Sequence, residues 1–356
     1  MTRRIAVVLG GRSSEHDVSV ASAQSVIEGL RQAGHEVETI AIDRTGGWTL
    51  ESGGDGTLLP GASGRFVPSH ATDVPDGPGT GGSELVRLPT PAVAHRLADV
   101  DVVFPVLHGP FGEDGTVQGL LELAGVPYVG AGVLASALCM DKDVFKSVLR
   151  DHDIPVTENI TLRAGDAPRN PFGYPCFVKP ARLGSSVGIT KAHDEAELEA
   201  GVALAFQHDE KVLVERLVTG IEVEVGVLGN RTPEASLPGE IVVSHNEWYD
   251  YEAKYDEGEM DLIVPARITP EQVERAQELA VRAFVATDCE GMARADMFVR
   301  DDGEVLVNEL NTIPGFTSTS VYARLFDASG LPYPALLDRL VDLALERHER
   351  RGRLRY

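Results

Sequence analysis

The residues with the clearest chemical meaning lie in segment 294–311, which the sequence predicts to be a β-hairpin. Two apolar-rich runs flank Asp301-Asp302-Gly303, and an Asp-Gly pair between such runs is a strong short-range hairpin signal. A two-residue loop at Asp302-Gly303 would set Asp301 opposite Glu304. That loop also fixes the pairing of every residue farther along both strands, because the register of a hairpin is set by its turn.

In this register Asp296 falls opposite Glu309, and Arg294 falls opposite Asn311. The four side chains share one face, since side chains alternate along a strand. Opposed like charges destabilise a sheet, so two carboxylates and an amide oxygen here suit a hard divalent cation such as Mg²⁺. The alternative is a solvent-facing acidic hairpin, and a three-residue loop would change the register.

A second chemical pattern begins at Lys179, which ends an apolar strand. The loop Gly184-Ser-Ser-Val-Gly188 follows shortly after it. Glycine lets backbone N–H groups approach phosphate oxygens, and serine adds hydroxyl donors. Because the lysine precedes the loop, the segment is not a P-loop. It is either a phosphate cradle or an ordinary turn.

Further charged residues fit a nucleotide. Lys142 opens a helix, near the positive helix end, and together with Lys179 it would bind two phosphates. Glu215 and Glu222 bracket a predicted hinge at 216–220, and carboxylates can hold an adenine amino group and ribose hydroxyls. Taken singly, each residue is by default explained as solvated surface charge.

Two residues follow the ends of predicted strands, where α/β sheets bind ligands. Glu15 lies in the strand-to-helix segment 9–19 and is placed to take a substrate ammonium. That segment lacks the G-x-G-x-x-G spacing of a dinucleotide fingerprint, and Ser13 or Ser14 is placed to cap the helix. His108 ends the fourth strand and is either an acid/base group or a hydrogen-bonded structural histidine.

Two loops complete the candidate residues. Segment 248–255 is charged and aromatic without a clean period, as expected for a lid that excludes water or for a surface excursion. Segment 311–320 continues from the hairpin. There the Gly315 backbone is placed to donate to an oxyanion, and Ser320 is placed to hold a carboxylate.

Composition narrows the functional classes. The 356 residues include 55 acidic and 32 basic side chains, for a net charge of −23, which argues against nucleic-acid and anionic-membrane binding. Two arginines precede a short apolar run at the start, too short for a signal-peptide core, and no long apolar span follows. Cys139, Cys176 and Cys289 form no Cys-x-x-Cys pair, which predicts reduced structural thiols in a cytoplasmic protein.

The first third alternates strands and helices, which predicts a parallel sheet wrapped by helices. Its predicted elements are strands Ile5–Leu9, Glu36–Ile42 and Val100–Leu107, and helices Ser19–Ala33 and Val117–Ala124. A Gly- and Pro-rich stretch at 44–90 interrupts the pattern, with possible short strands at Thr57–Leu59 and Leu85–Leu88 in what is otherwise predicted surface loop.

Two further units follow. The second has predicted helices Asp141–Asp151 and Glu195–Ala205 and strands Cys176–Lys179 and Lys211–Glu215. The third has strand Glu222–Leu228, a polar aromatic loop at 244–261, helix Pro270–Thr287, the hairpin, and helix Pro334–Arg347 with a basic tail that complements its C-terminus. The predicted domains are 1–137, 138–217 and 218–356.

Taken in order, these motifs resemble the D-alanine–D-alanine ligases of the ATP-grasp superfamily over nearly the whole chain. The matching segments are Leu9-Gly-Gly with Ser-Ser-Glu15, Leu-His-Gly109 with Gly112-Glu-Asp-Gly115, Met-Asp-Lys142, Val-Lys-Pro180, Gly-Ser-Ser-Val-Gly188, Tyr249–Tyr255, Arg294-x-Asp296 and Glu309–Gly315. Each motif is weak alone, whereas the ordered set is specific. The resemblance implies an α/β fold in which an N-terminal Rossmann-like parallel-sheet domain precedes two α+β domains that enclose ATP.

The resemblance also implies a reaction. ATP would phosphorylate the carboxylate of a first D-alanine, and the amine of a second would attack the acyl phosphate. The products would be D-alanyl-D-alanine for peptidoglycan precursors, ADP and phosphate. The implied cofactors are ATP and two Mg²⁺ or Mn²⁺ ions, and the implied state is a cytoplasmic homodimer.

Site roles carry over from the resemblance residue by residue. The implied catalytic residues are Glu15, Ser185, Tyr255, Arg294 and Gly315. The implied D-alanine contacts are Glu15, His108, Ser320 and Val321. The implied ATP contacts are Lys142, Lys179, Ser186, Glu215, Leu217, Glu222 and Lys254. The implied metal ligands are Asp296, Glu309 and Asn311. A Ser185–Tyr255 link would support Glu15, whereas Leu183 receives no role.

Two alternatives remain at this stage. One is an ATP-grasp ligase for other acids, such as a D-alanine–D-lactate ligase, a branch that tends to lack tyrosine at the position of Tyr255. The other is a non-catalytic nucleotide-binding module. The metal set beside Arg294 argues against it, since binding alone needs no oxyanion donor.

Overall fold

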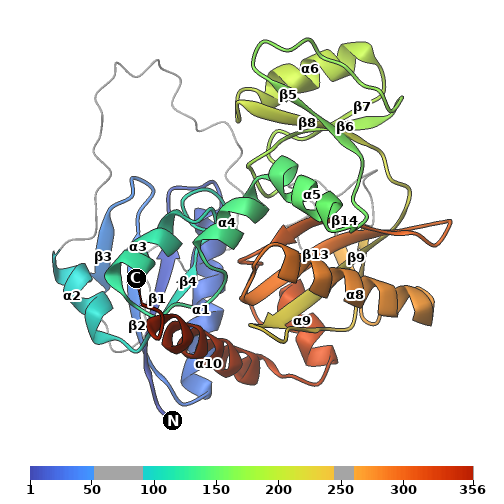
Figure 1. Ribbon diagram of the computed structural model, residues 1–356. Helices are drawn as coiled ribbons and strands as arrows, with labels where there is room; N and C mark the ends of the chain where they lie inside the picture. The colour runs from blue at the N-terminus through green and yellow to red at the C-terminus, as the bar shows by residue number, and fades with distance from the viewer. Residues whose placement is uncertain (52–90, 244–259, 356) are drawn as a thin grey trace, which may run out of the picture.

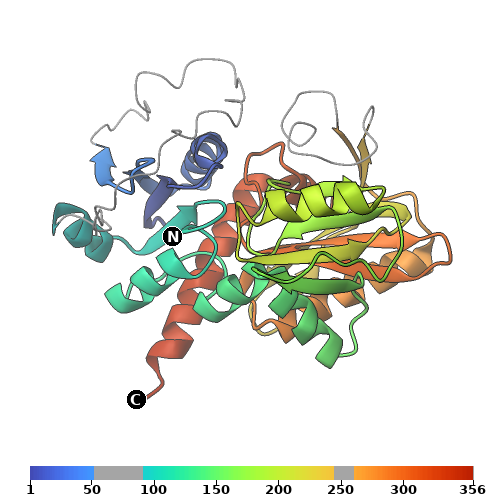
Figure 2. The same cartoon turned by 90° about the horizontal axis from the view of Figure 1, so that it is seen from above.

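The computed structural model describes residues 1–51, 91–243 and 260–355 (Figure 1). The described residues form three separate sheets, and helices pack against each of them. Figure 1 shows the central sheet above the C-terminal one, and Figure 2, seen from above, shows the N-terminal sheet set to one side of both. The possible strands at 57–59 and 85–88, and most of the 244–261 loop, lie outside the described residues.

The N-terminal sheet has the strand order β3-β2-β1-β4. Its strands are β1 (Arg4–Gly10), β2 (Glu36–Ile42), β3 (Trp48–Glu51) and β4 (Val102–Val106), and its helices are α1 (His16–Gln32), α2 (Pro91–Asp99) and α3 (Thr116–Ala124). The predicted parallel pairing is confirmed, because β1 runs parallel to both β2 and β4. Strand β3 and helix α2 were not predicted, and β3 adds an antiparallel edge.

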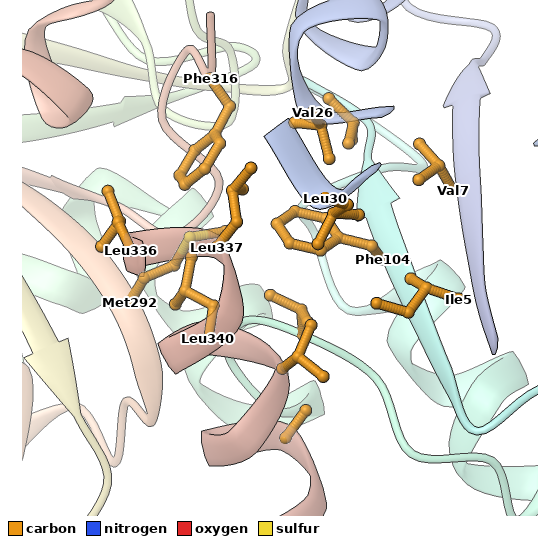
Figure 3. Packing of buried hydrophobic residues seen from close by; sticks show 14 of the residues in the cluster. Ile5, Val7, Val26, Leu30, Phe104, Met292, Phe316, Leu336, Leu337 and Leu340 are labelled. Carbon is orange, nitrogen blue, oxygen red and sulfur yellow. The ribbon is translucent and has the colours of Figure 1, made fainter. Parts of the chain in front are cut away.

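The core of this sheet includes a helix from the far end of the chain. Helix α10 (Tyr333–Gly352) packs against α1 and β4 (Figure 1). Leu336, Leu337 and Leu340 of α10 lie in one apolar cluster with Ile5 and Phe104 (Figure 3). Sequence alternation could not reveal this long-range packing. The C-terminal helix therefore closes the N-terminal unit.

The central sheet is antiparallel, with the order β5-β8-β6-β7. Its strands are β5 (Asn159–Arg163), β6 (Cys176–Pro180), β7 (Thr190–Ala192) and β8 (Lys211–Arg216). Helix α6 (Glu195–Ala205) covers it, beginning where the Asp194 side chain accepts from Glu197 N. The predicted bounds of α6 are confirmed, and β6 extends one residue past the prediction to Pro180.

The C-terminal sheet has the path β12-β11-β9-β13-β14, with β10 paired to β9. Its strands are β9 (Gly220–Gly229), β10 (Glu234–Ala235), β11 (Gly239–Val243), β12 (Met260–Ile263), β13 (Gly291–Arg300) and β14 (Val305–Asn311). Its associated helices are α4 (Val133–Met140), α5 (Lys142–Asp151), α8 (Pro270–Ala286) and α9 (Val321–Ala328). Phe145 and Leu149 of α5 join the core of this sheet rather than the central one.

The predicted register of the β13–β14 hairpin is correct near the site and wrong near the loop. Val299 pairs with Val305, and Arg300 N donates to Glu304 O at 2.9 Å, so Asp301 does not face Glu304. The loop therefore contains three residues instead of two. This extra loop residue alone would shift every pairing farther along the hairpin.

A β-bulge restores the predicted register. Asp296 pairs with Glu309, whereas its neighbour Met297 pairs with Val307, which leaves Asn308 as the extra residue. A bulge inserts one unpaired residue into a ladder and so offsets the longer loop. The predicted pairing of Asp296 with Glu309 is therefore confirmed for a reason that the sequence did not reveal.

The three cysteines are buried and unbridged. Cys139 and Cys289 come close in space, with their sulfur atoms 3.8 Å apart. No helix in the described ranges is long and apolar enough to cross a membrane. The domain boundaries at residues 137 and 217 remain a prediction.

Candidate active site

The metal-ligand candidates lie together at the end of the β13–β14 hairpin. Asn311 Nδ2 donates to Asp296 Oδ2 at 2.9 Å, and Arg294 makes two 2.7 Å contacts with the Asp296 carboxylate. Arg294 Nε also lies 2.9 Å from Oε2 of Glu224, a buried acid that sequence reasoning did not select. The predicted sharing of one face by Arg294, Asp296 and Asn311 agrees with these contacts.

Glu309 faces a cation from another part of the chain. Lys142 Nζ lies 3.2 Å from Glu309 Oε2 and donates to Leu183 O at 2.8 Å. Lys142 is in the first turn of α5, where the Asp141 side chain caps the helix by accepting from Val144 N. The capped helix thus carries a mostly buried lysine to the metal-ligand candidates.

The donor chemistry of this group fits a hard divalent cation. Two carboxylates and one amide supply oxygen atoms, the ligands that Mg²⁺ and Mn²⁺ favour. Arg294 and Lys142 now balance the carboxylate charges. No cluster of three His, Cys, Asp or Glu residues suited to a metal occurs in the described ranges, so Asn311 is needed to complete the set.

The carboxylate of Glu215 joins two lysines. One oxygen contacts Lys146 and the other contacts Lys179, and all three residues are at least nine-tenths buried. Burial raises the pKa of Glu215, but the two ammonium groups outweigh it and hold that pKa below its usual value. Burial lowers the pKa of Lys179, and Glu215 and Glu309 reverse this and raise it. Both groups are therefore charged at neutral pH.

The predicted hinge connects the central and C-terminal sheets. Leu217 lies between β8 and β9, and Glu222 lies near the start of β9. Glu222 pairs in register with Phe298 of β13. Both Leu217 and Glu222 are half-buried.

The serine loop reaches the N-terminal unit. Ser185 Oγ donates to the Glu15 carboxylate. Ser185 and Ser186 have φ values of 50° and 58°, in the left-handed region that side chains other than glycine rarely adopt. Two successive residues of this kind cost free energy, on the order of 1 kcal/mol each. The contact with Glu15 accounts for why the Ser185 conformation is retained.

Glu15 and His108 are brought together where β1 and β4 end. Ser13 Oγ donates to His108 O at 2.6 Å and accepts from Glu15 N at 3.2 Å. A Cβ atom on Gly109 would lie 2.7 Å from Glu15 Oε2, so this glycine is required for the close packing. Helix α1 has Glu15 as its N-cap and no side-chain cap hydrogen bond, so the prediction that Ser13 or Ser14 caps it is wrong. Ser13 instead joins the two strand ends.

His108 has one partnered and one unpartnered ring nitrogen. Nδ1 lies 3.0 Å from Ile313 O and so carries the proton, whereas buried Nε2 has no hydrogen-bond partner among the described residues. Burial lowers the pKa of His108, although nearby Glu15 opposes the shift. The His108 imidazole is therefore neutral, and its Nε2 atom can accept a hydrogen bond.

Sequence reasoning missed Glu113 as an individual residue, although it belongs to the matched Gly112–Gly115 motif. Its pKa is raised to about 8, first by burial and then by the charge of Glu15. A cavity lies beside it, lined also by Lys142, Glu309 and Asn311. In the sequence, Glu113 is an acid in a glycine-rich loop. Its spacing from other residues does not distinguish it from an acid on the surface.

The segment after β14 forms a small hydroxyl cluster. Ser320 Oγ accepts from Thr317 N at 3.0 Å and lies 2.6 Å from Thr317 Oγ1. A Cβ atom on Gly315 would lie 3.5 Å from Ser320 Oγ, so the two candidates are neighbours. Val321 begins α9 directly after them and is half-buried. Lys254 and Tyr255 lie outside the described residues, and so does the predicted Ser185–Tyr255 link.

The sequence was compared with known protein families. The family model described as D-ala D-ala ligase N-terminus matches residues 4–131, and the one described as D-ala D-ala ligase C-terminus matches residues 148–342. The chain belongs to the D-alanine–D-alanine ligase family. The predicted resemblance is therefore confirmed over most of the sequence.

Individual relatives in this family match almost end to end. The D-alanine–D-alanine ligase of Heliobacterium modesticaldum is 46% identical over 99% of this chain and 97% of its own length. The ligase of Mycobacterium sp. strain KMS is 47% identical over 97% of this chain and 96% of its own length. The ligase of Streptomyces avermitilis is 45% identical over 97% and 94%.

Solved structures confirm the mixed α/β fold of the ATP-grasp type. The D-alanine-D-alanine ligase from Coxiella burnetii superposes with a TM-score of 0.79 at 34% identity, covering 99% of this chain and 96% of that one. The VanG D-Ala:D-Ser ligase from Enterococcus faecalis superposes with a TM-score of 0.80 at 36% identity, covering 97% and 100%. Since the two enzymes are named for different acceptors, the family fold alone does not define the second substrate.

Proposed function

We propose that this chain joins two D-alanines at the expense of ATP, forming D-alanyl-D-alanine for peptidoglycan and releasing ADP and phosphate. The central observation is the Lys142–Glu309 contact of 3.2 Å, beside the linked Asn311, Asp296 and Arg294 side chains. This arrangement supports the proposal, because Lys142, Glu309 and Asn311 line one cavity and would offer it a cation for phosphate and oxygen ligands for metal. The names of the relatives at 44–47% identity support D-alanine as both substrates.

The nucleotide would lie between the central and C-terminal sheets. Lys142 and Lys179 supply positive charge for phosphates, and the Ser185–Ser186 loop supplies backbone and hydroxyl donors. Glu215 accepts from the adenine amino group. In the same proposal Glu222 accepts from ribose hydroxyls, Leu217 packs near the base, and Lys254 contacts a phosphate.

Asp296, Glu309 and Asn311 would hold two Mg²⁺ or Mn²⁺ ions. Ions held there would neutralise phosphate charge during phosphoryl transfer. Lys142 then exchanges its contact with Glu309 for a phosphate oxygen. Arg294 remains beside Asp296, where its guanidinium stabilises the charge that develops on the attacked carbonyl. The Gly315 N–H supplies the second donor to that oxygen.

The first D-alanine would bind at the ends of β1 and β4. Glu15 accepts from its ammonium, and the Ser185 hydroxyl fixes the carboxylate in place. Neutral His108 offers Nε2 as a further acceptor for that ammonium. Tyr255 extends the Ser185–Glu15 link in this proposal.

The second D-alanine would bind by its carboxylate at Ser320, with Val321 against its methyl group. The lone pair of its neutral amine attacks the carbonyl carbon of the acyl phosphate. The C–O bond to phosphate then breaks, and the departing phosphate takes up the proton that the nitrogen loses. Segment 244–261 would exclude water from the acyl phosphate, which otherwise hydrolyses.

An ATP-dependent reaction of this kind is expected in the cytoplasm. A homodimer is the expected assembly.

One assay identifies which amino or hydroxy acids the protein uses as substrates. Purified protein is given ATP and Mg²⁺ or Mn²⁺ with D-alanine, L-alanine, D-serine or D-lactate, and ADP release is measured while products are weighed by mass spectrometry. We expect D-alanyl-D-alanine when D-alanine is the only amino acid supplied. In mixtures with D-serine or D-lactate, the same dipeptide should dominate. ADP release without any dipeptide would contradict the proposal.

A further inference from the structure

Lys146 is a fully buried charged residue that the proposed reaction does not use. Its side chain has 0% exposure and lies on α5, one turn after Lys142. Its ammonium donates to Thr157 Oγ1, to the Glu215 carboxylate and, at 3.4 Å, to Asn308 Oδ1. A buried ammonium needs such partners, because an unpaired charge in the interior is very costly.

The three partners come from different parts of the site. Glu215 is the proposed adenine acceptor at the end of β8, and Asn308 is the bulge residue immediately before Glu309 on β14. Thr157 lies in the segment beside β14, where Val307 N donates to Pro155 O at 2.9 Å. Lys146 therefore connects the proposed adenine end of the site to the strand that carries the proposed metal ligands.

The charges around Glu215 suggest why two lysines are present. Lys179 and Lys146 each contact one carboxylate oxygen, so the buried group of three carries one excess positive charge. When Lys179 contacts a phosphate, its positive charge is divided between that phosphate and Glu215, so it stabilises the Glu215 carboxylate less. Lys146 cannot turn outward in this way, because it is enclosed and held by Thr157 and Asn308.

We propose that Lys146 is a positioning residue, which keeps Glu215 ionised and oriented toward adenine while Lys179 serves the phosphates. This inference rests on the proposed ATP-binding role of Glu215. Lys146 itself does not touch the nucleotide. Burial lowers the pKa of Lys146 to about 8, and Glu215 is the main group that opposes the shift, so each charge depends on the other.

The test uses Lys146→Met, which removes the charge and keeps an unbranched side chain that is one heavy atom shorter. The full-length protein with Mg²⁺ is titrated with ADP, GDP and tripolyphosphate by calorimetry. We expect ADP affinity to fall about tenfold or more, since a buried carboxylate loses its fixed partner. Tripolyphosphate affinity should change less than about twofold, because Lys142 and Lys179 remain. The preference for ADP over GDP should fall as well, since guanine has a carbonyl where adenine has the amino donor.

A double-mutant cycle with Glu215→Gln identifies the route of the effect. If Lys146 acts through Glu215, adding Lys146→Met to Glu215→Gln should cause little further loss of ADP affinity. Losses that multiply, or equal losses for ADP and tripolyphosphate, would overturn the proposal. An unchanged ADP affinity in Glu215→Gln alone would instead reject the adenine role of Glu215, and with it this inference.

Two controls protect the comparison from a general loss of structure. Thr157→Val removes one neutral partner of the same ammonium but leaves its contacts with Glu215 and Asn308, so the preference for ADP over GDP should change far less than in Lys146→Met. Lys146→Gln supplies a polar replacement should Lys146→Met not fold, and the same split between ADP and tripolyphosphate is expected. Circular dichroism checks the fold of each variant.

Discussion

Lys142 Nζ lies 3.2 Å from Glu309 Oε2, although the two residues are far apart in the sequence. Helix α5 presents the lysine, and the β13–β14 hairpin presents the carboxylate. The pair balances charge before substrates arrive, and each member has another proposed partner in the reaction. We therefore expect the contact to be exchanged rather than retained during turnover.

Glu309→Gln should abolish ligation while leaving the fold intact. The amide keeps the shape of the side chain but removes the charge that would hold a cation beside Asp296, with which Glu309 pairs in register. We expect turnover to fall by about 100-fold or more, because metal positioning contributes strongly to phosphoryl transfer. Turnover across a Mg²⁺ titration tests this, with circular dichroism as the control. Near-normal turnover at low Mg²⁺ would exclude the role.

Ser185→Ala should raise the KM for the first D-alanine without a comparable change in the KM for ATP. Its hydroxyl donates to Glu15, and loss of that bond costs about 1 kcal/mol, or roughly five- to tenfold in affinity. Ser185→Gly is the matched control, because it also lacks the hydroxyl but relieves the positive φ. Similar D-alanine kinetics in the two variants would assign the effect to the hydroxyl. A change confined to Ser185→Ala would assign it to backbone strain.

Glu113 should make the protein less stable as pH rises from about 5 to 8. Burial and the charge of Glu15 raise its pKa in the folded state to about 8, whereas the unfolded chain loses this proton near the ordinary value. In this window the folded state binds more protons, so the free energy of unfolding decreases with increasing pH. Urea unfolding of wild type and Glu113→Gln across this range tests the expectation. The variant should show a flatter pH dependence.

The control for this experiment is Glu28→Gln, which changes an exposed acid on α1. It should keep the pH dependence of wild type. Matching slopes for wild type and Glu113→Gln would mean that Glu113 ionises in the folded protein much as it does in the unfolded chain.

The hairpin illustrates how far sequence reasoning reached. The pairing of Asp296 with Glu309 was predicted correctly, but from a two-residue loop that does not exist. A three-residue loop and the bulge at Asn308 offset one another. Loop type and bulges depend on contacts such as Lys146 with Asn308, which local patterns do not encode.

Charged residues that the fold covers were the main site residues that could not be predicted from the sequence. Buried Lys146 and Glu224 and half-buried Glu113 look like surface charge when read one at a time, because charged side chains are rarely buried without partners. Their partners lie elsewhere in the sequence, as Glu215 does for Lys146. Residues in recognisable motifs, such as Lys142 and Glu309, were selected from the sequence, and the structure brings those two into contact.

The packing of α1 on α10 gives a final prediction, for Gly29. Alanine is normally about 1 kcal/mol more favourable than glycine inside a helix. Here, however, a Cβ atom on Gly29 would lie 2.4 Å from Leu337 Cδ1 and 2.9 Å from Tyr333 Cε1. Gly29→Ala should therefore destabilise the protein, by about 1–3 kcal/mol for an overpacked core.

Three further variants make this prediction specific. Gly119→Ala in α3 is the matched control: its added methyl group meets no atom within 4 Å, so this variant should be slightly stabilised. Leu337→Ala should cost about 2–5 kcal/mol by leaving a cavity. That cavity can receive the methyl group of Gly29→Ala, so the double variant should be less destabilised than the sum of the two single variants. Urea unfolding measures all four proteins, and strict additivity would show that the two helices do not meet at these residues.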